Sequence, residues 1–247
     1  MSFPTKVVNG IHLPIHDSHF SEQILRNPIV AGKGTYQFEK VEAALAVARA
    51  RGRAHFAIDI GAHVGLWTRM LARQFWYVLA FEPVPAHVHC FRKNLVDHGN
   101  VRVLDIALGE AERKIRLRVA GDDSGAANVD PEGSLEVSMG MLDALSIDPD
   151  LGMVDFIKID VEGYEHFVVM GGENLIRHCR PIIMIEQKAY MRRYGIERNS
   201  AIRLLESWGM HVVWEKKGDF CMSWNDQPAA PAAAMPVPAA AVETEAA

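Results

Sequence analysis

The chain has little of what marks secreted, membrane-spanning or nucleic-acid-coating proteins. Its 247 residues include three cysteines, which are far apart and form no C-x-x-C pair, so we expect neither a disulfide framework nor a zinc site. No segment approaches the ~18 consecutive apolar residues of a membrane-spanning helix, and the first residues lack the apolar stretch of a signal peptide. A net charge of −5 argues against a surface that binds nucleic acid. These absences predict a cytoplasmic protein without membrane or nucleic-acid partners.

The composition is that of a globular protein with a hydrophobic core. Hydrophobic residues make up 49% of the chain and charged residues 23%, and the length fits one domain with a few appendages. We expect an N-terminal arm over 1–38 that lies on the domain, and a main domain over 39–226. The Ala/Pro-rich stretch 227–247 has no aromatic residue, so we predict a disordered tail there.

The most informative stretch is AHFAIDIGAHVGLW, residues 54–67. An apolar run from Phe56 to Ile58 predicts a strand that is buried on both faces, as in a parallel sheet. Two glycines, Gly61 and Gly65, follow it, and then the apolar spacing of a helix begins at Leu66. A strand, a glycine turn and a helix in this order form a cradle for a nucleotide-like ligand, although such turns also occur for packing alone.

The residue pattern of the turn favours one ligand over another. Dinucleotide-binding turns read G-x-G-x-x-G, whereas this chain has Asp59 at the first glycine position and reads D-x-G-x-x-x-G. A carboxylate is unfavourable beside a pyrophosphate but favourable beside an ammonium or a sulfonium group. The turn therefore predicts S-adenosylmethionine rather than NAD.

A second predicted strand, 76–81, ends in Glu82 and Pro83. An acid at the end of the second strand, about 20 residues beyond the glycine turn, is where Rossmann-like folds hold the ribose hydroxyls. The alternative is a glutamate that merely ends a strand in water.

The middle of the chain predicts further elements of an α/β fold. We expect a helix over 85–98, a third strand over 101–104, and small or apolar groups around Ala107 that suit an adenine ring. An antiparallel strand over 115–119 precedes the stretch 121–140, which is rich in Gly, Ser, Asp and Asn. That stretch is an inserted hairpin or a lid, and the sequence leaves both open.

A second group of acids follows the predicted strand 154–159. Asp160, Glu162 and Glu165 lie within six residues at the carboxyl end of that strand, the edge where open α/β sheets bind ligands. We expect a helix over 165–178 and a fifth strand that ends in Glu186. The basic and aromatic loop 187–194 faces an anionic substrate or is a charged surface loop. A last helix over 200–208 and a β-hairpin over 211–224 complete a doubly wound, Rossmann-like α/β sheet whose last strand is antiparallel.

Several segments together resemble a known enzyme family, the FkbM-type S-adenosylmethionine-dependent methyltransferases. The resemblance runs from about residue 56 to 187. It is carried by DIGAHVGLWT, AFEPVPAHVHCFRKNL, ALGE, LDAL, DFIKIDVEGYEHFVVMGG and RPIIMIEQ. It implies a class I methyltransferase fold with seven strands, S-adenosylmethionine as cofactor, and methyl transfer, usually to a hydroxyl oxygen of a small molecule or sugar.

The resemblance also implies roles for individual residues. The cofactor would contact the turn and the acids at the strand ends, namely Asp59, Gly61, Ala62, His63, Gly65, Glu82, Pro83, Ala107 and Asp160. Many relatives have Asn where this chain has His63. Asp160 would lie beside the methionine part and the acceptor. Glu162 and Glu186 would border the acceptor pocket. Lys188 and Tyr190, from the basic and aromatic loop beyond the resemblance, are further substrate candidates.

The catalytic candidates are Asp160, Glu162 and Lys158. An alcohol is a poor nucleophile at neutral pH, so a general base helps. We expect Asp160 to accept the proton or to orient the acceptor, with Lys158 and His63 as weaker candidates. We predict no metal site, because adjacent acids mostly serve caps and hydrogen bonds. A divalent metal on Asp160, Glu162 and Glu186 is the second possibility, since hard oxygen ligands suit magnesium.

Two rival functions remain. A nucleic-acid amino methyltransferase would carry Asn/Asp-Pro-Pro-aromatic after the fourth strand, and this chain has Asp160-Val161-Glu162-Gly163 there. A non-catalytic S-adenosylmethionine-binding module is the other rival, since sequence does not separate binding from turnover. The acceptor and the oligomeric state are not readable from the sequence.

Overall fold

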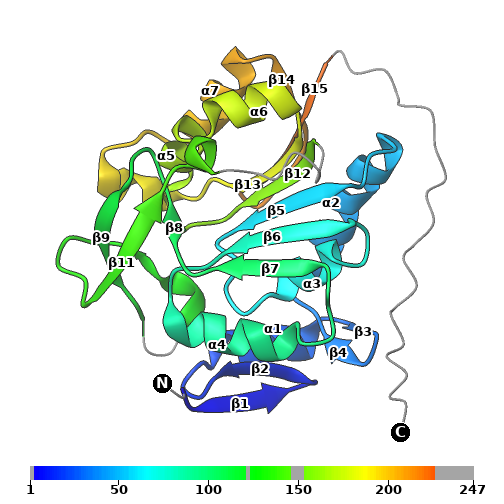
Figure 1. Cartoon of the computed structure of the whole chain (residues 1–247), viewed down its shortest axis with the longest axis vertical. Helices are drawn as coiled ribbons and strands as arrows, with labels where there is room; N and C mark the ends of the chain where they lie inside the picture. The colour runs from blue at the N-terminus through cyan, green and yellow to red at the C-terminus, as the bar shows by residue number, and fades with distance from the viewer. Residues whose placement is uncertain (1–2, 121–122, 146–152, 226–247) are drawn as a thin grey trace, which may run out of the picture.

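The computed structural model describes residues 3–120, 123–145 and 153–225. Its centre is a seven-stranded sheet in the order β14-β15-β13-β12-β5-β6-β7 (Figure 1). The strands are β5 (Phe56–Ile60), β6 (Tyr77–Phe81), β7 (Val101–Leu104), β12 (Val154–Ile159), β13 (Ile182–Glu186), β14 (Met210–Lys216) and β15 (Asp219–Trp224). The first five run parallel, and β15 runs antiparallel to both β13 and β14. The predicted doubly wound sheet with an antiparallel last strand is confirmed.

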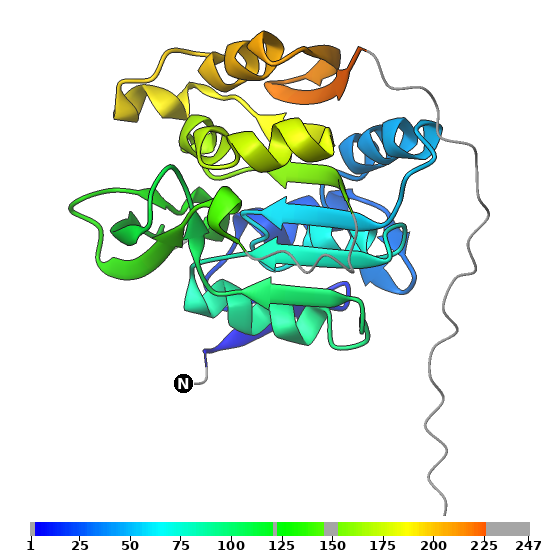
Figure 2. The same cartoon turned by 45° about the horizontal axis from the view of Figure 1, so that its top comes forward.

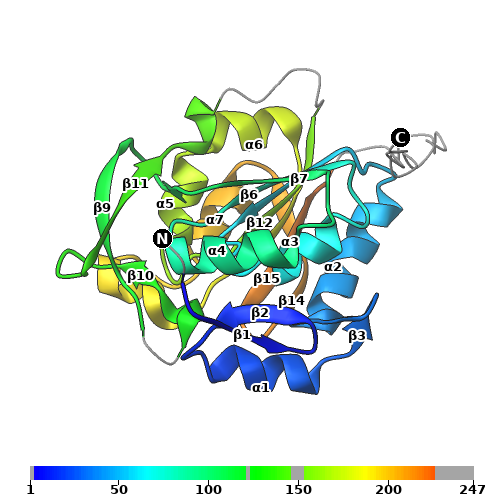
Figure 3. The ribbon, with the colours of Figure 1, turned by 60° about the horizontal axis from the view of Figure 1, so that its bottom comes forward.

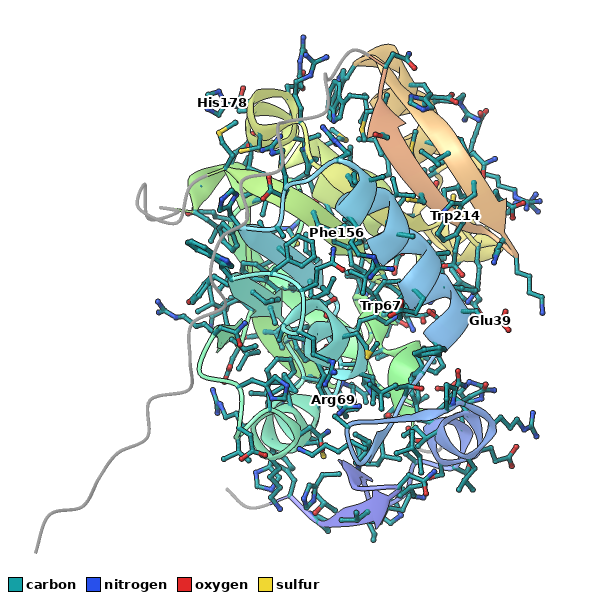
Figure 4. All side chains as sticks on the ribbon, turned by 90° about the vertical axis from the view of Figure 1, so that its right-hand side faces the viewer. Glu39, Trp67, Arg69, Phe156, His178 and Trp214 are labelled. Carbon is teal, nitrogen blue, oxygen red and sulfur yellow. The ribbon has the colours of Figure 1, made fainter. Side chains whose placement is uncertain are left out.

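Helices cover both faces of this sheet (Figure 3). One face carries α2 (Phe38–Ala50), α3 (Leu66–Leu71) and α4 (Pro85–Asn94), and the other carries α5 (Glu165–Met170), α6 (Glu173–Cys179) and α7 (Ser200–Ser207). Successive side chains of a strand point to opposite faces, so Phe56 and Ile58 pack toward α5–α7 while Ala57 packs toward α2 and α3. Trp67 and Phe156 pack beneath α2, on the face of the sheet that α2 and α3 cover (Figure 4).

The N-terminal residues form small elements beneath α3 and α4 (Figure 1). These are the hairpin β1 (Thr5–Val8) and β2 (Ile11–Pro14), α1 (His19–Arg26), and the short pair β3 (Ile29–Val30) and β4 (Lys33–Gly34). Asn94 of α4 bonds to both backbone groups of His12 and donates to the carbonyl of Val64. Arg69 of α3 donates to the carbonyls of Val30, Lys33 and Gly34 (Figure 4). Buried polar bonds therefore attach the arm to the sheet domain.

A second sheet stands beyond the carboxyl ends of the central strands (Figure 2). Its order is β10-β9-β11-β8, from β8 (Ala107–Leu108), β9 (Arg113–Arg118), β10 (Asn128–Val129) and β11 (Leu135–Gly140). A 3₁₀ turn, η1 (Ser124–Ala126), precedes β10. In the described residues 123–140, β11 pairs with β9, and residues of η1 and β10 line a cavity.

The structure differs from the sequence-based prediction in two helices. The predicted helix 85–98 ends at Asn94, whose carbonyl accepts a bond from Lys33 Nζ. The predicted helix 165–178 is broken into α5 and α6 at Gly171 and Gly172. A Cβ at Gly171 would lie 1.9 Å from the carbonyl oxygen of Gly109, just after β8, so only glycine fits there, and glycine is a weak helix former.

Two further predicted segments are the loop 187–194 and the tail 227–247. The predicted loop 187–194 contains a 3₁₀ helix, η4 (Ala189–Tyr194). The predicted disordered tail, 227–247, lies outside the described residues. Across the three described ranges, no helix has the length and apolar character needed to cross a membrane.

Candidate active site

The glycine turn after β5 brings the ends of β5 and β12 into contact. Gly61 has a φ of +77°, and a Cβ on it would lie 1.8 Å from the carbonyl oxygen of Asp160. The amide of Asp160 donates to the carbonyl of Ile60. Gly65, with a φ of +87°, then starts α3. Between them His63 adopts a φ of +51°, a conformation that His tolerates better than most residues.

The first of two cavities lies over this turn and encloses about 620 Å³ of free space, its open mouth included. Its apolar walls come from the ends of β5 and β6, from β8 and from β9. Of the residues predicted to hold the cofactor, it is lined by Gly61, His63, Glu82, Pro83, Ala107 and Asp160. The segment Ser124–Val129 contributes the opposite wall. The structure therefore gathers six of the predicted residues around one space.

Glu82, at the end of β6, is buried and holds the turn in place. Its Oε2 accepts the amide of His63 at 2.8 Å. Its Oε1 accepts the amide of Val84 at 2.9 Å and His87 Nδ1 at 3.1 Å, which must carry the proton because a carboxylate only accepts. A carboxylate has about four lone-pair positions. Glu82 therefore keeps one free position on Oε2 for a ligand hydroxyl, rather than the two that a bidentate contact to a diol needs.

Asp59 does not line either cavity. Its side chain is fully buried, and its Oδ2 accepts the hydroxyl of Thr68 at 2.6 Å. Its Oδ1 lies 3.4 Å from Nζ of Lys158, its neighbour in the β5–β12 register. The structure thus places Asp59 beneath the turn, where it holds Lys158.

Lys158 is a buried ammonium group. Its Nζ donates to the carbonyl of Gly61 at 3.2 Å and lies 3.6 Å from Asp160 Oδ2. Burial by itself lowers the pKa of Lys158, but the carboxylates of Asp59 and Asp160 outweigh burial and raise it above its ordinary value. Lys158 therefore keeps its proton at neutral pH and does not fit the role of a general base.

The second cavity adjoins the first and encloses about 520 Å³ of free space. The two share Gly61, His63, Gly125, Asp160 and Glu162. The remaining wall of the second cavity is formed by Phe20, Tyr36, Ala62, Leu66, Trp67, Lys158, Glu186 and Lys188. After the roles that we propose for them below, we call the first the cofactor cavity and the second the acceptor cavity. Asp160 lies where they meet.

Three acids gather at this junction. One carboxylate oxygen from each of Asp160, Glu162 and Glu186 lies within 4.8 Å of the others. Burial, with Asp160 nearby, raises the pKa of Glu162 to about 8 and that of Glu186 to about 9. Lys188 Nζ is ion-paired with Oε1 of Glu186 at 2.5 Å, and this contact raises the pKa of Lys188 against the effect of its burial.

Two other residues of the predicted acidic and basic segments lie outside the cavities. Glu165 is buried, and its Oε1 accepts the amides of Val161 and Gly163, which fixes the turn after β12. Burial raises the pKa of Glu165 to about 7. Tyr190 is 40% exposed and stacks beside Arg193. The structure does not bring Tyr190 to the predicted acceptor site.

A buried chain of hydrogen bonds connects the arm, η1 and the glycine turn. Ser124 Oγ donates to Asp17 Oδ2 and lies 2.6 Å from His63 Nε2. Because Ser124 uses its one proton on Asp17, His63 donates from Nε2 and its Nδ1 is left as an acceptor. That Nδ1 is buried without a partner. Burial, His87 and Lys158 hold the pKa of His63 well below its ordinary value, so the ring is neutral and a weak base.

Three cavity residues, Phe20, Trp67 and Ser124, were not among the residues predicted for the site. Tyr36 belongs to the glycine-containing segment 32–37, which the sequence leaves open as a ligand-closing loop or a plain N-cap turn, and it lines the acceptor cavity. Phe20 and Ser124 stand in no recognisable motif. They reach the cavities through tertiary contacts alone.

The family model of the methyltransferase FkbM domain matches residues 59–212. Among solved structures, the FkbM methyltransferase of Methylobacillus flagellatus KT is 18% identical with a TM-score of 0.47, over 68% of this chain and 43% of that one. This chain thus spans less than half the length of that protein. The N-methyltransferase NodS of Bradyrhizobium japonicum WM9 is 12% identical with a TM-score of 0.48, over 75% and 92%. A putative O-methyltransferase from Klebsiella pneumoniae is 15% identical with a TM-score of 0.45, over 82% and 86%.

No curated protein matches the chain in sequence. The structural likenesses are weak, so the assignment depends on the domain match, which covers more than half of the chain and includes the glycine turn, Glu82 and the acids after β12 and β13. The resemblance noted in the sequence is confirmed: the chain belongs to the family of FkbM-type S-adenosylmethionine-dependent methyltransferases.

Proposed function

We propose that the protein transfers a methyl group from S-adenosylmethionine to a hydroxyl oxygen of a small molecule or sugar. The cofactor would occupy the cofactor cavity and the acceptor the acceptor cavity. The observation that carries this proposal is the position of Asp160, which lines both cavities at their junction. A group there can contact the transferred methyl and the attacking oxygen together.

The residues of the cofactor cavity fit S-adenosylmethionine in three respects. Ile106 and Leu108 offer an apolar wall for an adenine ring. Glu82 has one free lone-pair position for a ribose hydroxyl. Gly61 lines the cavity with backbone alone, beside Asp160, where the methionine part would pass. Glu82, Gly61 and Asp160 are therefore the groups that would hold the cofactor.

The protein's own contribution to the reaction is positioning. When bound, S-adenosylmethionine supplies a methyl group on a positively charged sulfur. Asp160 is suited to accept the hydrogen bond of the acceptor hydroxyl and to take its proton as the oxygen attacks. The ammonium group of Lys158, 3.6 Å from Oδ2, holds the Asp160 carboxylate in position. Holding the reacting centres in line can contribute several kcal/mol, about 7 or more in well-oriented systems.

The charge of the acceptor cavity favours a hydroxyl over an amine. Asp160, Glu162 and Glu186 surround the site with carboxyl groups. The negative charge of Asp160 stabilises an ammonium ion, which has no lone pair to attack a methyl group. A hydroxyl is neutral in the same surroundings. The sequence after β12 also lacks the Pro-Pro-aromatic pattern of nucleic-acid amino methyltransferases.

Calorimetric titration with S-adenosylmethionine, S-adenosylhomocysteine and NAD tests the cofactor. We expect micromolar binding of the two adenosyl compounds and none of NAD. Glu82→Gln should weaken adenosyl binding by about tenfold or more, because a charge-assisted hydrogen bond is lost. Glu206→Gln, an exposed change of the same type on α7, should leave it unchanged. Binding of NAD alone would contradict the proposal.

Transfer of a radiolabelled methyl group to a panel of sugars and small alcohols, each paired with its deoxy analogue, tests the acceptor. Methylation that requires the hydroxyl supports the proposal, and methylation of amines in its place overturns it. Asp160→Asn should bind cofactor and lose most turnover. Near-full turnover in this variant would remove Asp160 from its proposed role.

A further inference from the structure

The acid cluster in the acceptor cavity has a geometry that the methyl-transfer proposal does not use. One oxygen each from Asp160, Glu162 and Glu186 lies within 4.8 Å of the other two. Ligands around a single magnesium or calcium ion lie about 2.0–2.6 Å from it, so opposite ligands are about 4–5 Å apart. The three oxygens can therefore surround one ion without a change of the backbone.

The charges of the cluster do not balance. Four carboxyl groups, those of Asp59, Asp160, Glu162 and Glu186, are close to two ammonium groups, Lys158 and Lys188. Lys158 lies between Asp59 and Asp160, and Lys188 pairs with Glu186. A buried charge without a counter-charge is costly, and the raised pKa values of Glu162 and Glu186 keep these two groups protonated at neutral pH. Ionisation of all four carboxyl groups would need two further positive charges, which is the charge that one divalent cation supplies.

An unpartnered oxygen gives an independent indication of a ligand. The Glu186 side chain is 3% exposed, and although Oε1 pairs with Lys188, Oε2 is buried with no hydrogen-bond partner. Glu186 lines the acceptor cavity together with His63, whose Nδ1 is also a buried acceptor without a partner. His63 Nδ1 is an acceptor, and Glu186 Oε2 is one once its carboxyl group is ionised. A cation with its bound water satisfies both, because the cation favours the ionised carboxylate and coordinated water donates hydrogen bonds.

We propose that Asp160, Glu162 and Glu186 bind one divalent cation, magnesium or manganese, in the acceptor cavity. All three ligands are hard carboxylate oxygens, which suit magnesium, manganese and calcium, whereas zinc sites use Cys and His. The described part of the cluster contributes three ligands, so the remaining positions are open to water or to the acceptor.

The role of this ion rests on the proposed function. A cation beside Asp160 would bind the acceptor hydroxyl, favour its deprotonated form and place it at the junction of the two cavities. The oxygen then forms its bond to the methyl carbon while the carbon–sulfur bond breaks, and the electron pair of that bond goes to sulfur. The hydroxyl proton leaves to Asp160 or to solvent. No other reactant is needed.

Manganese binding to the chelator-treated full-length protein, without cofactor or acceptor, tests the site directly. Electron paramagnetic resonance measures free manganese during the titration. We expect one site with a dissociation constant below about 1 mM, and competition by magnesium. Glu186→Gln should weaken manganese binding by about tenfold or more, since even the residues that support metal ligands change affinity by that much. Glu206→Gln is the matched control, with binding expected to be unchanged.

The unfolding midpoint in the absence of metal establishes that Glu186→Gln is folded. Glu162→Gln, a second ligand variant, should weaken binding in the same way. Absence of manganese binding to the wild type, or equal binding by both ligand variants and the control, overturns the proposal. Binding of an organic amine in the same cavity with no manganese binding also overturns it, because the missing charge is then supplied by the amine.

A chelator separates this inference from the proposed function. If S-adenosylmethionine binds and methyl transfer continues undiminished in the chelator, the role of the ion in methyl transfer is wrong and methyl transfer stands. If manganese binds at Glu186 but S-adenosylmethionine does not, the metal site stands and methyl transfer fails. Loss of turnover in the chelator with restoration by magnesium supports both.

Discussion

At some positions of this protein, the close approach of two backbone segments determines which residue type fits. Gly61 is the clearest case, because the end of β5 touches the end of β12 at this position. The positive φ alone would favour glycine, but many glycines meet that condition. What sets Gly61 apart is the carbonyl oxygen of Asp160, which lies where a side chain would begin.

We expect Gly61→Ala to lower the free energy of unfolding by about 3 kcal/mol or more, because the new methyl group overlaps Asp160 and adds to the cost of a positive φ. Gly195→Ala is the matched control. Gly195 has a φ of +71° but no atom within 4 Å of a Cβ, so the change should cost only the backbone strain, about 1–2 kcal/mol. Urea unfolding measures both. Equal losses would show that the contact with Asp160 is unimportant.

At this scale the sequence predicts where a residue lies better than what its side chain contacts. Glu82 and Asp160 were predicted at strand ends, and both line the cofactor cavity. Asp59 was predicted to contact the cofactor, yet its carboxylate holds Thr68 and Lys158 beneath the turn. The difference follows from strand alternation, because Asp59 points to the same face as Ala57. Its partners come from α3 and β12, which no local pattern identifies.

At the scale of elements, η1 and α1 meet over the cavities through buried hydrogen bonds. Asp17 accepts both the amide and the hydroxyl of Ser124, and it also accepts the amide of Phe20 at the start of α1. Phe20 in turn packs against His63 and Tyr36. The position of Ser124 therefore depends on the arm, and the shape of both cavities depends on Ser124.

We expect Ser124→Ala to loosen η1, because Asp17 loses one donor and His63 Nε2 loses its acceptor. Amide hydrogen exchange should become faster in 123–129 and 18–24, and S-adenosylhomocysteine binding should weaken several-fold. Ser207→Ala, which removes an exposed hydroxyl at the end of α7, should change neither. Unchanged exchange in both segments would show that the hydrogen-bond chain does not hold η1.

Elements with a strong local pattern were predictable, and elements shaped by remote contacts were not. The five parallel strands follow from apolar runs that end in an acid or a turn. At the break between α5 and α6, close contacts with remote segments leave room only for glycine, since a Cβ would meet Gly109 at Gly171 and Leu142 at Gly172. The last carbonyl of α4, that of Asn94, bonds to Lys33 of the arm, a contact that no local pattern predicts.

At the scale of the whole molecule, the arm contributes to the core and to the acceptor cavity. Ile11, Leu13 and Ile24 are fully buried against Val64 and Cys90 of the sheet domain. Phe20 and Tyr36 form one wall of the acceptor cavity. The sequence predicted an arm that lies on the domain over 1–38. The packing leads us to propose that arm and domain form one cooperative unit.

A substitution of Asn94 tests whether arm and domain unfold together, because its side chain makes three hydrogen bonds that join β2, α4 and the glycine turn. We expect Asn94→Ala to lower the free energy of unfolding by about 2–4 kcal/mol, since buried backbone groups of His12 and Val64 lose their partners. Asn174→Ala, at an exposed position of α6, should cost under about 0.5 kcal/mol. Denaturant unfolding should show one transition, at the same midpoint by tryptophan fluorescence and by circular dichroism. A separate early transition in Asn94→Ala would mean that the arm unfolds on its own, and the acceptor cavity would then have a wall that the rest of the domain does not hold in place.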